Sequence, residues 1–223
     1  MYSNQKVGRI TGILMLFIFI SGVIIFQFLQ GPVLFSEDFL TATSEKSNQI
    51  ISSTVLGIFS GIASIIIATL VFPMFKKHSI LLAYVYFAFC ILNFISIMID
   101  NVSVVSMLEL SKEYVKNGND NLQTTFATLA YQKHWWTHYF HLLISCFPVF
   151  VMYYTLYIAE LVPRIISVFG LMAVVLMFIE ELFSIFGHSI SMNMLLPMGL
   201  IQLILPVWLV YKGFNSIKED DTM

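Results

Sequence analysis

The sequence predicts an all-α fold, a polytopic transmembrane bundle with six membrane-spanning helices. Three observations carry this prediction: an apolar composition, a scarcity of charge, and six long apolar segments. Hydrophobic residues make up 58% of the 223 residues, charged residues make up 11%, and the mean hydropathy is +0.86. Because soluble domains carry about 25% charged residues, we expect an integral membrane protein, with a single membrane domain over residues 1–223.

The six segments are defined by length. A transmembrane helix needs about 20 mostly apolar residues, since each adds 1.5 Å across a core of about 30 Å. Segments 7–30, 50–75, 79–100, 136–161, 163–186 and 194–214 meet this requirement. The first is interpreted as a retained helix, because its apolar run is longer than a signal-peptide core and no small-x-small cleavage site follows it. Pro163 suits the first turn of the fifth helix, where a missing N–H costs nothing.

The connections differ in character. Residues 31–49 link the first two helices, and residues 187–193 form a short loop before the sixth. Residues 101–135 are amphipathic rather than apolar, and they predict a helical outer loop. It prolongs the third helix, turns at Asn117–Asp120 and returns as a helix capped by Asp120 or Asn121.

Small residues recur every fourth position in the second helix, at Ser53, Gly57 and Gly61. Such a face lets two helices approach closely and gain dispersion contacts that lipid would not supply. We interpret it first as packing within the bundle. The alternative is a homo-oligomer formed through the Gly57 and Gly61 face.

Basic residues in the flanks predict orientation, because Lys and Arg are enriched in cytoplasmic loops. The side of the N-terminus collects seven of them, namely Lys6, Arg9, Lys76, Lys77, Arg164, Lys212 and Lys218. The opposite side has four, namely Lys46, Lys112, Lys116 and Lys133. We therefore expect both termini in the cytoplasm. Membrane lipids are the expected partners, and a net charge of −2 without a long basic run argues against nucleic acid.

Three short patterns carry a family resemblance. They are GRITGIL at the first helix (8–14), LVPRIISVFG leading into the fifth (161–170), and WLVYKGF closing the sixth (208–214). Together they resemble a large bacterial family of six-helix membrane proteins that is catalogued as a domain of unknown function. The resemblance implies a six-helix bundle in the bacterial cytoplasmic membrane, and it implies no activity.

The stretch HWWTHYFH (134–141) holds three of the five histidines. His134, His138 and His141 form one helical stripe about 60° wide. In the predicted topology, the carboxylates of Glu180 and Glu181 lie at a similar depth in the outer half of the membrane. Asp100 and His188 lie at neighbouring helix ends.

Ionisable residues at membrane depth mark functional sites, and imidazole with carboxylate is a zinc-binding combination. The sequence therefore predicts a candidate metal site of His138, His141 and Glu181, for a divalent ion such as zinc. Further candidate ligands are Glu180, Asp100, His134 and His188. A metal held there could activate water against a lipid ester or amide.

A plainer interpretation carries more weight. Trp135, Trp136 and Tyr139 are typical of the aromatic belt at a membrane boundary, and a carboxylate could simply tie a histidine across the bundle. A cluster that responds to histidine titration is a further interpretation. We expect a non-enzymatic protein with a structural, sensing or accessory role. The alternatives are a metal-dependent intramembrane hydrolase acting from the outer side, and a small-solute transporter suggested by prolines within helices.

Overall fold

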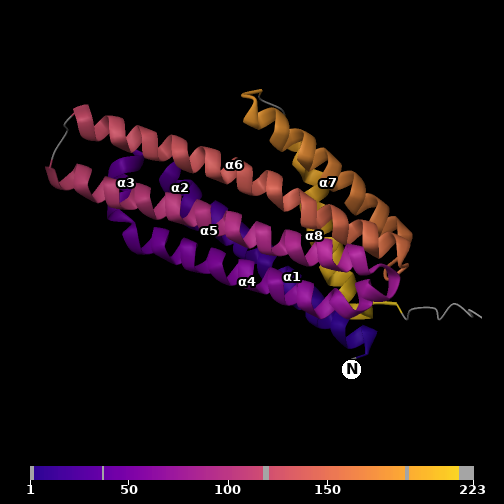
Figure 1. Cartoon of the computed structure of the whole chain (residues 1–223). Helices are drawn as coiled ribbons and strands as arrows, with labels where there is room; N and C mark the ends of the chain where they lie inside the picture. The colour runs from indigo at the N-terminus through magenta and orange to yellow at the C-terminus, as the bar shows by residue number, and fades with distance from the viewer. Residues whose placement is uncertain (1–2, 37, 118–120, 189–190, 216–223) are drawn as a thin grey trace, which may run out of the picture.

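The computed structural model describes residues 3–36, 38–117, 121–188 and 191–215, shown as a ribbon in Figure 1. All regular secondary structure in these residues is helical, which confirms the all-α prediction. Within the described residues, six helical spans are long and apolar enough to cross a membrane: Asn4–Leu34, Ser47–His78, Ile80–Lys116, Thr124–Ile158, Arg164–Ile185 and Asn193–Lys212. The chain is a multi-pass membrane protein, as predicted.

The elements follow one another with short connections. In chain order they are α1 (Asn4–Val23), a π-helical segment (Ile24–Gln30), α2 (Gly31–Leu34), α3 (Phe39–Glu45), α4 (Ser47–His78), α5 (Ile80–Asn117), α6 (Asn121–Ile158), α7 (Arg164–Ile185), a 3-10 turn (Met192–Leu195) and α8 (Leu196–Lys212).

The third and fourth helices are much longer than their predicted membrane segments. α5 and α6 each contain 38 residues, about 57 Å at the helical rise and nearly twice the thickness of a hydrocarbon core. Residues 101–117 thus prolong the third helix, and the fourth helix starts at Asn121 rather than at 136. The middle of the predicted turn, with Asp120, lies outside the described residues.

The part of the α5–α6 helical hairpin that extends beyond the predicted membrane segments has its own apolar core. Val33, Val104, Met107 and Leu108 are fully buried there, and the rings of Phe39 and Tyr131 lie 5.0 Å apart. We call this part, made of α2, α3 and residues 104–131 of the described chain, the cap. Its helices α2 and α3 lie in segment 31–49, which was predicted from the sequence only as the connection between the first two membrane helices. The spans of α5 and α6 join the cap to the bundle (Figure 1).

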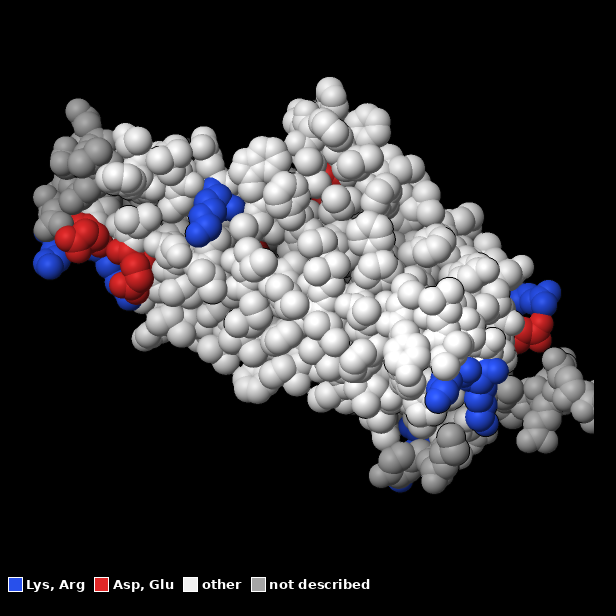
Figure 2. All heavy atoms as spheres, viewed as in Figure 1, with Lys and Arg blue, Asp and Glu red and all other residues white. Residues whose placement is uncertain are grey.

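The opposite end of the molecule carries both ends of the described chain, and we call it the terminal end. Asn4 Nδ2 donates a hydrogen bond to the Asn215 carbonyl over 3.2 Å. Asn215 in turn donates to the carbonyls of Leu161 and Glu160, over 2.9 and 2.8 Å. In Figure 2 the charged side chains gather mainly toward the two ends, with a broad uncharged surface between them.

Glycines allow α1 and α8 to pack with their backbones in contact. A Cβ on Gly12 would lie 2.7 Å from the Pro206 carbonyl oxygen and 2.9 Å from the Val210 nitrogen, and one on Gly8 would lie 2.3 Å from the Phe214 nitrogen. All three segments of the family resemblance, 8–14, 161–170 and 208–214, therefore contribute to the terminal end.

Gly57 and Gly61 face α5 within the same chain. A Cβ on Gly61 would lie 2.4 Å from a ring carbon of Phe94, and one on Gly57 would lie 3.3 Å from the Asn101 side chain. The small-residue face of α4 is thus used for packing inside the bundle. Self-association through this face stays a prediction.

We predict that Gly12→Leu destabilises the protein by about 1–3 kcal/mol, because a side chain there must push the backbone of α8 away. The melting temperature in detergent should fall by about 3–10 °C. Gly22→Leu in the same helix is the matched control, since a Cβ at Gly22 meets nothing within 4 Å. Equal melting temperatures for the two variants would contradict the close contact.

Candidate functional site

The buried carboxylate of Asp100 on α5 is the centre of a polar network with α6. Its Oδ1 lies 3.0 Å from His134 Nδ1 and accepts a hydrogen bond from Thr137 Oγ1 over 2.8 Å. Its Oδ2 lies 3.5 Å from His138 Nδ1. Because an ionised carboxylate can only accept, both imidazoles are oriented with their Nδ1–H toward it.

The network is buried and extends along α5. Asp100 is 9% exposed and His134 is 8% exposed. Ser103, one turn after Asp100, has its Oγ 2.8 Å from Thr137 Oγ1 and donates to the Asp100 carbonyl over 2.9 Å. The network thus ties α5 to α6 immediately below the cap core, which begins at Val104.

The third histidine of the stripe has a different partner. His141 Nδ1 lies 3.0 Å from Ser96 Oγ, and Ser96 donates its only hydroxyl hydrogen to the Asn93 carbonyl over 2.7 Å. Ser96 therefore accepts the N–H of His141. Since Ser96 and Asp100 are four residues apart on α5, they form one polar face that meets the three histidines of α6.

The carboxylates of α7 lie apart from this network. Glu180 and Glu181 are 7% and 1% exposed. Ser184 donates to Glu180 over 3.1 Å, while Oε2 of Glu181 has no hydrogen-bond partner in the structure. Glu181 interacts electrostatically with Glu180 and with Cys146 of α6. Within the described residues, no hydrogen bond joins either glutamate to a histidine.

The predicted ligands are therefore divided among separate places. Asp100, His134 and His138 are brought together, His141 binds Ser96, and the His188 ring lies 5.9 Å from the Phe183 ring. Among the described residues, no group of three or more His, Cys, Asp or Glu side chains is arranged to hold a metal ion. The metal site stays a prediction.

The aromatic residues of HWWTHYFH form the other face of the same helical segment. The Trp135 ring packs edge-to-face against Trp136 and at a tilt against Tyr139, with ring centres 4.9 and 4.5 Å apart. Trp136 is 44% exposed, and it lines, with Tyr131 and Gln132, a pocket of about 420 Å³. HWWTHYFH is therefore two-sided, with histidines toward α5 and aromatic rings toward the outside.

Sequence reasoning missed the hydroxyl residues of the network, Ser96, Ser103 and Thr137. Their spacing could have indicated them. Ser96 and Ser103 lie one turn on either side of Asp100, and Thr137 lies three residues after His134 on the same helical face.

Residues 10–213 match the model of the family described as Domain of unknown function (DUF4386). The chain belongs to this family. The match confirms the resemblance carried by the three patterns, and it extends from within the first span through the end of the sixth span of this DUF4386 protein. No curated protein and no solved structure matches the chain.

We predict that Asp100→Ala lowers stability by about 3 kcal/mol or more, because it leaves the buried Nδ1–H of His134 without its carboxylate acceptor. The melting temperature in detergent should fall by about 6–12 °C. Glu109→Gln is the matched control, since Glu109 is an exposed acid on the same helix and forms a surface ion pair with nearby Lys112. A melting temperature of Asp100→Ala within 1 °C of that control would contradict the network's structural role.

Proposed function

We propose that this DUF4386 protein acts without catalysis, as a structural or accessory membrane protein that holds a helical cap at one side of the membrane. The observation that supports this proposal is the Asp100 network itself. Its carboxylate accepts from His134, Thr137 and His138, all on one partner helix, at the junction of bundle and cap.

These bonds leave the carboxylate little capacity for other chemistry. A charged group in the membrane is costly unless it is paired, and here three donors from α6 approach the same two oxygens. A general base or metal ligand needs a lone pair directed at a substrate or an ion. In Asp100 both oxygens contact donors of α6, which favours a role in helix attachment.

Hydrogen exchange tests this role. His134→Phe keeps a ring but removes the imidazole donor from Asp100, so the junction should open more often. We expect faster amide exchange in α3 (Phe39–Glu45) with little change in α8 (Leu196–Lys212), measured by mass spectrometry in detergent. His188→Phe is the control, because His188 is exposed and lies far along the chain from the cap. Unchanged exchange in α3, or an equal increase in α8, would contradict the proposal.

We further propose that the protein lies in the bacterial cytoplasmic membrane with both termini in the cytoplasm and the cap outside. The distribution of basic residues supports this orientation. Of the seven residues predicted for the cytoplasmic side, six are described, and they flank the spans near the terminal end: Lys6, Arg9, Lys76, Lys77, Arg164 and Lys212. The cap side has four, in agreement with the positive-inside rule.

Cysteine labelling tests the orientation in intact cells. The native Cys90 and Cys146 are both buried, so they give a low background. Glu45→Cys on the cap should react with a membrane-impermeant maleimide, whereas His78→Cys at the terminal end should react only after permeabilisation. The reverse pattern would place the cap in the cytoplasm and overturn the proposed orientation.

One observation favours the metal-dependent hydrolase as a second candidate. The three histidines of α6 all direct Nδ1 toward α5, and ligand histidines in metal proteins are commonly held by such a second partner, leaving Nε2 for the metal. The small-solute transporter stays a prediction.

Elemental analysis of the purified full chain separates the candidates. The non-catalytic proposal expects no stoichiometric metal after exposure to zinc and removal of excess. About one zinc per chain, lost in His138→Ala/His141→Ala but kept in His188→Ala, would instead favour the hydrolase.

A further inference from the structure

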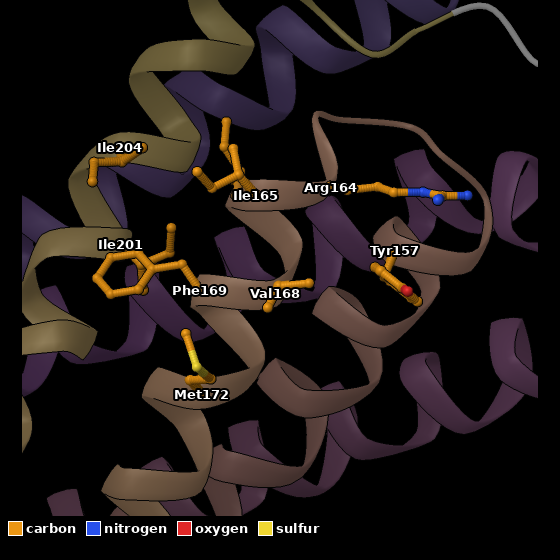
Figure 3. A pocket seen from close by; sticks show the side chains of 9 residues that line it. Tyr157, Arg164, Ile165, Val168, Phe169, Met172, Ile201 and Ile204 are labelled. Carbon is orange, nitrogen blue, oxygen red and sulfur yellow. The ribbon is translucent and has the colours of Figure 1, made fainter.

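Besides the pocket beside Trp136, the structure has a pocket at the terminal end, between α7 and α8. It is a pocket of about 650 Å³, within the range of small-molecule sites. Figure 3 shows Ile165 and Phe169 of α7 on the side of Ile201 and Ile204 of α8, with Arg164 and Tyr157 at the edge of the pocket. Its walls are thus apolar and its edge carries a cation.

The polar edge lies at the level of lipid headgroups. α7 contains 22 residues, about 33 Å, so its first residue falls at the membrane boundary. Arg164 is that first residue. Met172, also a lining residue, lies eight residues farther along, about 12 Å deeper by the helical rise. The pocket therefore runs from the headgroup level into the acyl-chain region. This extent suits a molecule with a polar headgroup and an apolar chain.

The guanidinium can accept a further anion. Its Nη2 donates to Glu160 over 2.5 Å, and the group lies 5.8 Å from the centre of the Tyr157 ring. A guanidinium has five N–H donors, and the Arg164 side chain is 67% exposed. Donors beyond the bond to Glu160 are thus accessible, and phosphate oxygens are well matched to them.

The apolar walls are open to the surrounding bilayer. Ile165 is 79% exposed, Met172 is 54% exposed and Ile204 is 44% exposed, whereas Ile201 at the base is fully buried. We propose that this pocket binds one anionic phospholipid, with its phosphate at Arg164 and an acyl chain between α7 and α8. Basic pockets between membrane helices bind anionic headgroups in this manner.

Native mass spectrometry of the purified full chain tests the site, with phosphatidylglycerol and phosphatidylcholine of identical acyl chains as probes. The wild type should retain one phosphatidylglycerol about fivefold more strongly than phosphatidylcholine, the effect of about one cationic contact. Arg164→Gln should abolish this preference. Ile204→Trp, which fills the apolar part, should weaken retention of both lipids, and Lys76→Gln on α4 should change neither.

Glu160→Gln gives a result that misfolding cannot produce. It removes the carboxylate that competes for Arg164, so retention of phosphatidylglycerol should increase. Inorganic phosphate at equal concentration should not displace the lipid, because it lacks the acyl chain. Equal retention of the two lipids by the wild type, retained preference in Arg164→Gln, or a dimer that excludes lipid would overturn the proposal. In the last case a second copy of the chain occupies the pocket.

Discussion

A bilayer core offers no water and no counter-ions, so every polar group within it must find its partner inside the protein. Hydroxyl side chains satisfy this constraint by donating to carbonyls of their own helix, as Thr155 does to Val151 over 2.7 Å. The π-helical segment of the first span is satisfied from a neighbour, because Gln49 donates to the carbonyls of Phe28 and Leu29 over 2.9 Å. The Asp100 network is the same constraint applied to a carboxylate, and it joins α5 to α6 where the chain leaves the bundle.

The elements of the fold were predictable because membrane insertion depends on composition, which can be read along the chain. The ends of α5 and α6 were not, because a helix continues as long as residues such as Val104 and Met107 find an apolar partner, whether or not lipid surrounds it. α2 and α3 depend on the same cap core. Their formation follows from contacts with residues far along the sequence, which no local pattern contains.

The sequence predicted which histidines share one side of their helix, but not which neighbouring helix that side contacts. Helical spacing correctly placed His134, His138 and His141 on one stripe, yet it could not say which neighbouring helix the stripe faces. The structure turns it toward Asp100 and Ser96 of α5 rather than toward Glu181 of α7. The side of a helix on which a residue lies follows from its position in the sequence. The helix that packs against that side is set by the packing of the whole bundle.

The three patterns of the family resemblance lie at the terminal end rather than at the histidines. Gly8 and Gly12 allow α1 to touch α8, and Asn215 hydrogen-bonds the turn after α6. This packing fixes α8 beside the start of α7. At the start of α7, the Arg164 side chain remains exposed. The close packing of α1, α8 and the turn after α6 therefore sets the surface of the terminal end, where the proposed lipid pocket lies, whereas the Asp100 network is buried between α5 and α6.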